Sequence, residues 1–383
     1  MSKERAAIAQ AAATGLRQFA QERPDCPVLV GFDGFVDSII AVVNKRHDAE
    51  HYEPVKTIDQ FGKKIQNAAG MSSNYELVVT LEKLGGNGPI MASALASAGL
   101  PVTYIGVLGH PAIHSVFQDF AKRAEVHSIG EPGYTDALEF SDGKLLLGKY
   151  ESLKDLTWAR MQDVIGDAPL RAIIHRSALI GMVNWTMLPC MSDIWRQLVK
   201  VLAAEGDGQR KQVFIDLADP EKRTSEDLSR ALSLCGEFQK HVDLTLGMNL
   251  KESSQVAEVL GIKVPPDAAD AEGAIEATAG AIRAKLSLYC VVIHPRKGAA
   301  ASRQRDGKAE SASFQGPFVQ EPKLSTGAGD NFNAGFCLGN LAGLSLAQSL
   351  CAGTATSGYY VRNAASPTLQ QLAAFCEKLP APQ

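Results

Sequence analysis

One stretch near the C-terminal end of the chain combines small residues with a carboxylate in a way that suits phosphate chemistry. It reads Thr326-Gly327-Ala328-Gly329-Asp330, and apolar residues at helical spacing follow it, so we expect a loop that leads into a helix. Gly327 and Gly329 let the backbone turn its N–H groups toward one point, where a helix start adds partial positive charge. The pattern indicates an anion site with Asp330 beside it as a base; the alternative is a simple helix cap.

Two further groups of polar residues follow the first predicted strand and open a predicted helix. An apolar run that ends at Gly31 is followed by Asp33 and Asp37, as expected of a ligand site at the carboxyl end of a parallel strand. Further along, Gly85-Gly86-Asn87 opens a helix of small residues that can lie close to a sheet. The alternatives are turn or capping roles for the two aspartates and a glycine-rich turn without a ligand.

A third group lies at the start of another predicted helix. Asn249 and Glu252 are three residues apart, which places an amide and a carboxylate on one side of the first helical turn. Helix capping by Asn249 is the alternative interpretation. By contrast, the segment 143–150 imitates a phosphate-binding P-loop, but Tyr150 stands where Ser or Thr would bind a metal, and the intervening leucines favour a strand.

These motifs together resemble the signatures of the PfkB carbohydrate kinase family, the ribokinase-like sugar kinases. The resemblance covers roughly residues 27–365, and its two glycine-rich signatures occur in the family's order with N-x-x-E between them. It implies an ATP-dependent transfer of the γ-phosphoryl group to a hydroxyl of a sugar or sugar derivative. It further implies that Asp330 is the catalytic base and that the backbone of Gly327, Ala328 and Gly329 forms the anion hole.

The resemblance also implies the remaining site residues and the cofactors. ATP and Mg²⁺ are the implied cofactors, with Mg²⁺ arranged through water and no direct protein ligand assigned. The implied substrate-binding residues are Asp33, Asp37, Gly85, Gly86 and Asn87, and the implied residues for ATP and Mg²⁺ are Asn249, Glu252 and Gly298. A stretch beginning at Asp216 occupies the place of the family's D-x-N-x-R motif, with Asp219 where Asn is expected, and we assign it no chemistry.

The sequence departs from the family's pattern at two places that concern nucleotide and cation binding. Where the family usually shows T-x-G-x-x-G, this chain has Ile293 and Pro295, and only Gly298 keeps the register, so the donor nucleotide stays open. Leu324 lies six residues before Asp330, where many members carry an aspartate linked to a monovalent cation site. An apolar side chain cannot ligate potassium, so we expect activity that depends little on this ion.

Composition is ordinary for a soluble globular protein, and a small-molecule partner is the default. The 383 residues are 45% hydrophobic and 21% charged, and the net charge of −4 predicts no nucleic-acid partner. Apolar runs fall short of a membrane span, and the seven cysteines, odd in number and without a C-x-x-C pair, favour a reducing compartment. We therefore expect a cytoplasmic protein with no membrane partner.

The order of predicted elements indicates the fold. Apolar runs of strand length alternate with helix-length segments after residue 177, which predicts a parallel sheet with helices on both faces. Together with the resemblance, this gives an α/β fold of the ribokinase-like type, three-layer α/β/α with a mostly parallel central sheet plus a small β lid. We expect a single kinase domain over residues 1–383, with lid segments within 38–70 and 131–150, where Asp142-Gly143 marks a hairpin.

Three questions stay open at this level. A nucleoside kinase has the same machinery and differs in what fills the lid-side pocket, so the acceptor is a sugar or a nucleoside. A sugar-binding regulatory protein with lost activity is a second alternative, suggested by Ile293, Pro295 and Leu324. The exposed edge strand of a lid can pair with a strand of a second copy, so a homodimer through the lid is also expected.

Overall fold

The central element of this computed structural model, which describes residues 3–22, 25–204, 210–263 and 272–383, is a nine-stranded sheet. Its strands are β1 (Val28–Phe32), β5 (Val102–Gly106), β6 (Glu125–Ser128), β9 (Leu179–Val183), β10 (Gln212–Asp216), β11 (Asp243–Met248), β12 (Cys290–Ile293), β13 (Gly298–Arg305) and β14 (Lys308–Gln315). Their order is β14-β13-β12-β11-β10-β9-β1-β5-β6. The strands from β12 to β6 pair in parallel, and β13 and β14 add an antiparallel edge.

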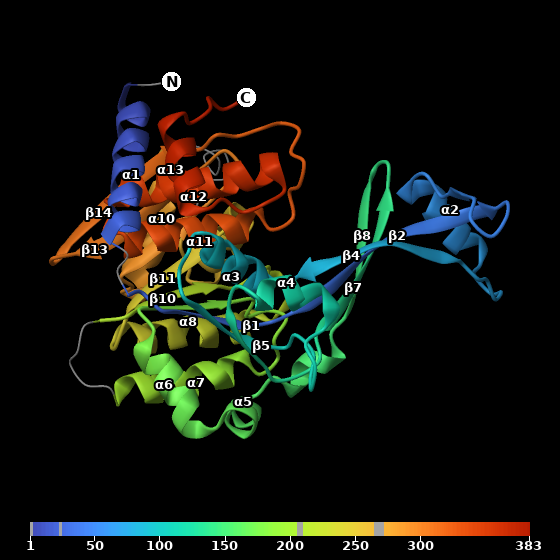
Figure 1. Cartoon of the computed structure of the whole chain (residues 1–383), viewed down its shortest axis with the longest axis horizontal. Helices are drawn as coiled ribbons and strands as arrows, with labels where there is room; N and C mark the ends of the chain where they lie inside the picture. Colours follow the sequence, from blue (N-terminus) through green and yellow to red (C-terminus); the bar gives the residue numbers. More distant parts are fainter. Residues whose placement is uncertain (1–2, 23–24, 205–209, 264–271) are drawn as a thin grey trace.

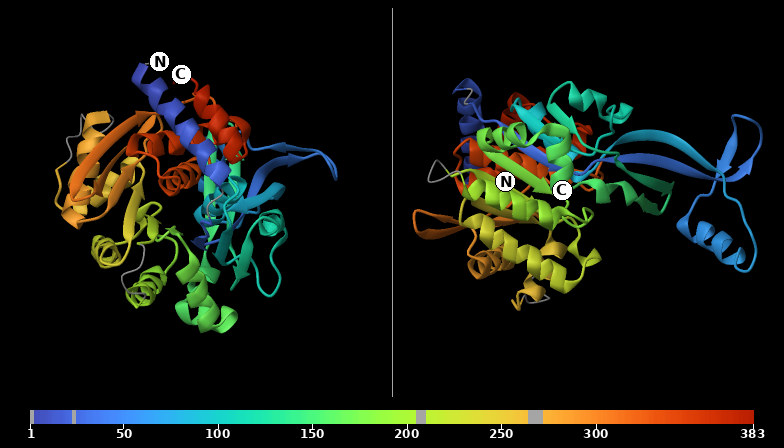
Figure 2. Two further views of the ribbon diagram at one scale, coloured as in Figure 1. Left: turned by 60° about the vertical axis from the view of Figure 1, so that its left-hand side comes forward. Right: turned by 90° about the horizontal axis from the view of Figure 1, so that it is seen from below.

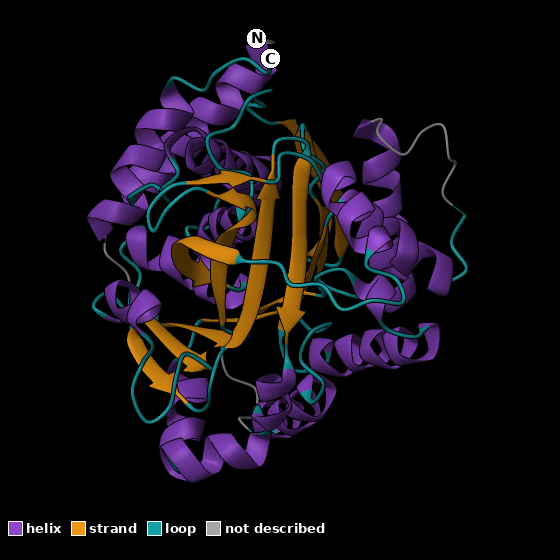
Figure 3. Cartoon of the chain, turned by 90° about the vertical axis from the view of Figure 1, so that its right-hand side faces the viewer, coloured by secondary structure: helices purple, strands orange, loops and turns teal. Residues whose placement is uncertain are grey.

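Helices cover both faces of this sheet, because alternate residues of its strands feed two separate hydrophobic cores (Figures 1 and 3). One core receives α1 (Lys3–Glu22), α3 (Asn87–Ser97), α4 (Gln118–Ala121), α11 (Ala328–Leu341), α12 (Leu346–Asn363) and α13 (Leu369–Glu377). The other receives α5 (Trp158–Ile165), α6 (Asp167–Arg176), α7 (Met191–Ala203), α8 (Ser225–Gln239), α9 (Leu250–Val259) and α10 (Glu272–Leu286). The predicted three-layer α/β/α arrangement is confirmed.

Short connections and the thiols complete this part of the molecule. The 3₁₀ turns are η1 (Ser115–Phe117), η2 (Glu151–Asp155) and η3 (Pro220–Lys222). All seven cysteines are free thiols, and those at 235, 290, 337, 351 and 376 are buried. Within the described ranges, the structure contains no helix long and apolar enough to span a membrane.

The strand order places a switch point where a ligand site is expected. From β1 the sheet grows through β5 to β6 on one side and through β9 to β12 on the other, so the crossovers run in opposite directions. In open α/β sheets, ligands bind beyond the carboxyl ends of the strands at such a point. Asp33 follows β1 there, and Asn184 follows β9.

A second, five-stranded sheet projects from the main body as a lid-like extension (Figures 1 and 2). Its elements are β2 (Phe35–Arg46), β3 (Tyr52–Pro54), β4 (Leu77–Gly85), β7 (Gly133–Phe140) and β8 (Gly143–Lys149), with α2 (Ile58–Asn67) inserted between β3 and β4. The long strand β2 pairs with β7 in parallel and with β3 and β4 in antiparallel fashion. Segment 143–149 is a strand, as expected, and the predicted hairpin at Asp142-Gly143 is present.

The extension is larger than the sequence suggested and has a core of its own. Its sheet uses residues 77–85 in addition to the expected segments, and the helix α2 was not predicted because few apolar residues mark residues 45–66. Phe61 of α2 packs against Ile40 and Phe140 in a cluster separate from the two main cores. Ile58 and Phe61 lie on the face of α2 that packs in this cluster, and Thr57 caps the start of the helix by accepting from the backbone N–H of Gln60 (3.1 Å).

Candidate active site

The carboxylate of Asp330 lies at the start of α11, where the two glycine-rich motifs meet. Gly327 caps this helix with φ of 88°, a left-handed conformation that favours glycine, and Asp330 is 6% exposed in its first turn. The side-chain amide Nδ2 of Asn87 donates a hydrogen bond of 2.9 Å to Oδ1 of Asp330. Two motifs that are far apart in sequence therefore form one site, as the resemblance implied.

Asp33 holds the start of α3 in place. Its buried carboxylate accepts hydrogen bonds from the backbone N–H groups of Asn87 (3.0 Å) and Gly88 (2.8 Å) and from the side-chain amide of Asn184 (2.7 Å). Burial raises the pKa of Asp33 to about 6, although these donors oppose the shift. Both carboxylate oxygens are already engaged, so the geometry favours a role in positioning Asn87 over the predicted direct contact with substrate.

Asp37 lies on the lid strand β2, between Lys83 of β4 and Thr135 of β7. Burial raises the pKa of its carboxyl, while the charge of Lys83 and a hydrogen bond from Thr135 lower it. The backbone of Gly85 passes so close that a Cβ atom there would lie 2.5 Å from the Asp37 carboxylate. The glycine at 85 is therefore required by close approach, and it joins the lid carboxylate to the Gly85-Gly86-Asn87 turn.

Asp216 is a site residue to which the sequence analysis gave no role. It ends β10, is 6% exposed, and accepts hydrogen bonds from Asn333 Nδ2 (2.7 Å) and from the backbone N–H of Ala218 (2.9 Å). Burial raises the pKa of Asp330 well above its usual range, and the charge of Asp216 adds to the shift. The sequence signal that could have identified Asp216 is its position as a carboxylate at the end of a predicted parallel strand.

Asn249 and Glu252 form a capping box at the start of α9. The Asn249 side chain accepts from Glu252 N (3.0 Å), and the Glu252 carboxylate accepts from Asn249 N (2.8 Å) and from Asp219 N (2.8 Å). Glu252 is 4% exposed, and burial, followed by the charge of Asp216, raises its pKa to about 7. The capping alternative is therefore what the structure contains, and the predicted role of the pair toward Mg²⁺ stays a prediction.

The surroundings of this pair fit a hydrated cation better than a directly bound one. In the described ranges, no group of three or more His, Cys, Asp or Glu side chains is arranged to hold a metal ion. Asn333 donates to Asp216 through Nδ2, but its Oδ1 atom is buried without a hydrogen-bond partner among the described residues. Asp216 is also close enough to Glu252 for its charge to raise the pKa of Glu252. Mg²⁺ commonly keeps several waters, which such outer-sphere oxygens can orient.

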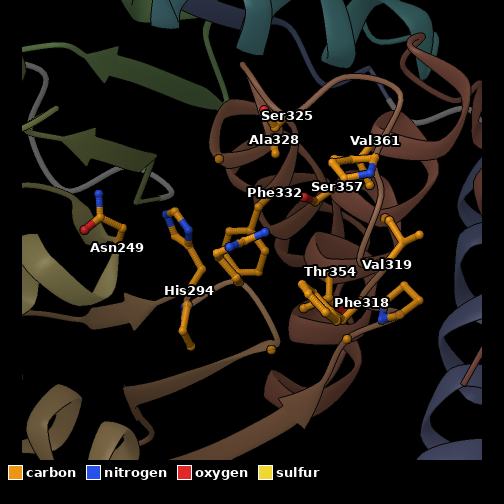
Figure 4. A pocket seen from close by; sticks show the side chains of 18 residues that line it. Asn249, His294, Phe318, Val319, Ser325, Ala328, Phe332, Thr354, Ser357 and Val361 are labelled. Atoms are coloured by element: carbon orange, nitrogen blue, oxygen red, sulfur yellow. The ribbon is translucent and has the colours of Figure 1, made fainter. Parts of the chain in front are cut away.

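A cavity of about 420 Å³ opens on the other side of the start of α11 (Figure 4). Ala328, Gly329 and His294 line the part of it that adjoins the start of α11, which we call its inner end, and Gly298 also lines it. The remaining lining residues are Asn249, Pro295, Arg296, Gly316, Pro317, Phe318, Val319, Pro322, Ser325, Phe332, Thr354, Ser357, Gly358 and Val361. A mostly apolar cavity of this size with backbone N–H groups at one end suits a nucleotide.

Side chains of the protein donate hydrogen bonds to the carbonyl groups of the loop before α11. The Tyr360 hydroxyl donates to the carbonyl of Thr326 (2.9 Å), and Asn331 Nδ2 donates to the carbonyl of Gly327 (2.9 Å). Ser366 in turn donates to Asn331 Oδ1 (2.8 Å). The loop that presents Ala328 and Gly329 is thus held in shape by the protein itself.

The fold and this site define a ribokinase-like carbohydrate kinase of the PfkB type: a mostly parallel sheet between helices, a β lid, and glycine-rich motifs that meet at one carboxylate. Within that class, the chain belongs to the prokaryotic ketohexokinase family, whose model matches residues 5–379. It is 29% identical over 367 residues to a ketohexokinase from Haloferax volcanii, an alignment that covers 95% of this chain and 94% of that protein.

Solved structures show the same fold at low sequence identity. A carbohydrate kinase from Agrobacterium tumefaciens matches with a TM-score of 0.62 at 18% identity, over 93% of this chain and 98% of that one. A ribokinase from Arabidopsis thaliana, complexed with ribose and ATP, matches with a TM-score of 0.61 at 16% identity, over 92% of this chain and 99% of that one. These matches confirm the predicted fold class, and membership of the prokaryotic ketohexokinase family confirms the sugar kinase class.

The close approach at Gly85 generates a first prediction. Gly85→Ala should displace the Asp37 carboxylate and raise KM for the sugar by about tenfold, the value of one weakened charged hydrogen bond. The measurement is steady-state kinetics with the sugar varied at saturating nucleotide. Gly236→Ala is the matched control, because a Cβ at Gly236 meets nothing within 4 Å. An unchanged KM in Gly85→Ala would show that Asp37 does not act on the sugar.

Proposed function

We propose that this protein transfers the γ-phosphoryl group of ATP to a hydroxyl of a ketohexose. The observation that carries the proposal is the hydrogen bond between Asn87 and Asp330, because it joins the turn that leads from the lid to the helix start whose Ala328 and Gly329 line the cavity. Membership of the prokaryotic ketohexokinase family favours a ketohexose over a nucleoside as acceptor. An assay of ADP release with ketohexoses, aldohexoses, ribose and adenosine tests it, and turnover confined to adenosine or absent throughout would reject it.

Asp330 is the proposed base. In the free protein its raised pKa, caused by burial and by nearby carboxylates, favours the protonated form. Cationic charge that arrives with the nucleotide would favour the ionised form, which can accept the proton of the attacking hydroxyl. The Asn87 amide then holds the carboxylate in one orientation while the alcohol approaches.

The backbone N–H groups of Gly327, Ala328 and Gly329 are the proposed anion hole for the transferred phosphoryl group. Their loop is preorganised by hydrogen bonds from Tyr360 and Asn331, so little reorganisation is needed during the reaction. Asn249 and Glu252 would hold Mg²⁺ through water, and this ion would supply positive charge to the nucleotide phosphates. On the sugar side, Asp37 and the Gly85-Gly86-Asn87 turn are the proposed contacts.

Replacement of the base generates a second prediction. Asp330→Asn keeps the volume and the contact with Asn87 but cannot accept a proton, so kcat should fall by roughly 10²–10⁴-fold. ADP release measures kcat, and calorimetric titration measures sugar binding, which we expect to persist. Asp119→Asn, at an exposed carboxylate on α4, is the control. Near-normal turnover in Asp330→Asn would reject the assigned base.

A third prediction concerns monovalent cations. Leu324 offers no ligand to an ion, and the carbonyl groups of Thr326 and Gly327 already accept hydrogen bonds from the protein. We expect the turnover rate to change little when potassium replaces sodium at constant ionic strength. A large stimulation by potassium in a steady-state assay would contradict this expectation.

We further propose that two copies of the chain associate through the lid. Cross-strand pairing aligns Leu81, Ile39, Ala137 and Leu146 in one row, on the same face of the sheet as Asp37. Leu81 is 56% exposed and Leu146 is 67% exposed, at the two ends of this row, which is unusual for large apolar residues on one face of a sheet. A second lid packed on this row would cover it and narrow access to the sugar site.

The row generates a fourth prediction. Leu146→Asp should convert a dimer into a monomer, because it places a charge in the proposed apolar contact. Light scattering coupled to size-exclusion chromatography measures the mass. Leu147→Asp is the matched control, since Leu147 is 51% exposed but points to the opposite face. A monomeric unmodified protein, or equal effects of both substitutions, would reject the lid as the interface.

A further inference from the structure

His294 lines the cavity beside the start of α11, in the part that Ala328 and Gly329 also line. The residue directly follows β12, and its backbone N–H donates to the carbonyl of Met248 (2.9 Å). Its ring packs on Phe332, with ring centroids 4.6 Å apart and planes tilted by 31° (Figure 4). Its Cε1 atom lies 3.4 Å from the position that a Cβ of Gly329 would take. The ring edge therefore borders the proposed anion hole.

The Nε2 atom of this ring has no hydrogen-bond partner among the described residues, although it is buried. A buried polar atom without a partner is unfavourable, so its presence calls for a ligand or a water. Burial also lowers the pKa of His294 to about 4, so the ring is neutral at physiological pH. A neutral imidazole can present Nε2 as an N–H donor.

The distribution of charge explains why a donor is useful at this place. The cationic side chains near the cavity are engaged by other groups: Arg296 and Lys297 lie over the ring of Phe318 at 5.6 and 5.9 Å. The Arg362 guanidinium donates to the carbonyls of Gly358 (2.9 Å) and Phe318 (3.3 Å). The His294 ring instead lies beside Gly329 at the start of α11, where it can add a donor to the backbone N–H groups of Ala328 and Gly329.

We propose that His294 binds the nucleotide, with Nε2 donating a hydrogen bond to a phosphate oxygen at the inner end of the cavity. This inference rests on the proposed function, because it assumes that the cavity takes a nucleoside triphosphate. Stacking on Phe332 restricts the ring plane, so the side chain loses less conformational freedom when it binds a ligand. His294 stands within the segment where the family's usual motif is lost, so it supplies a contact that this chain otherwise lacks.

Two substitutions separate the donor from the bulk of the ring. His294→Leu fills much of the same volume without a polar atom, and His294→Gln restores an amide N–H near the position of Nε2. We expect His294→Leu to raise the KM for ATP and the Kd for ADP by about tenfold, as for loss of one hydrogen bond to a charged group. His294→Gln should recover most of this loss, and the KM for the sugar should stay unchanged in both.

A control tests for the general effect of replacing a buried threonine. Thr278 on α10 lies outside the cavity, and its hydroxyl donates to the carbonyl of Ala274 (2.8 Å). Thr278→Val should therefore leave nucleotide affinity unchanged. Thermal unfolding of each variant shows whether the fold is kept, and His294→Gln decides the question if His294→Leu does not fold.

The outcomes distinguish this inference from the proposed function. Equal affinity of His294→Leu and the unmodified protein for ADP would overturn the role of His294 while leaving the kinase assignment intact. So would a His294→Gln variant as weak as His294→Leu, because that result points to packing rather than to a donor. An unmodified protein that neither binds ADP nor consumes ATP with any sugar would instead reject the proposed function.

Discussion

One hydrogen bond, from the Asn87 amide to the Asp330 carboxylate, joins the two halves of the candidate site. It depends on two helix starts being held at the same point in space. Asp33 secures the first by capping α3, and Asn184, across the topological switch point, orients Asp33. The left-handed turn at Gly327 secures the second. The parallel sheet matters because it brings these strand ends and helix starts to one edge.

The site buries several carboxylates with little compensating positive charge from side chains. Asp33, Asp216, Glu252 and Asp330 are each at most 6% exposed, and burial raises the pKa of each. Backbone N–H groups and amide side chains satisfy their oxygens, which explains why the fold tolerates them. A site of this kind gains most when cationic charge arrives together with the anionic nucleotide, so binding and ionisation of the base should be coupled.

The lid extends the site away from the main sheet. Asp37 lies near the start of the lid strand β2, where Gly85 brings this strand against the turn that carries Asn87. Further out, the sheet has its own small core around Phe61 and α2, and an exposed apolar row lies on the face that carries Asp37. Movement or pairing of the lid would therefore act on the surroundings of Asp37, whereas residues of α11 and α12 in the main body line the cavity.

The sequence by itself determined the features that depend on neighbouring residues: the turn at Gly327, the paired positions of Asn249 and Glu252, the hairpin at Asp142-Gly143, and the alternation that specifies the sheet. Short-range geometry is enough for these, because each is set within one turn of helix or one loop. Only the tertiary structure decided that Asp33 holds α3, that Asp216 joins the cluster, and that the ring of His294 lies beside Gly329. Those relations depend on the pairing of strands distant in sequence, which no local spacing encodes.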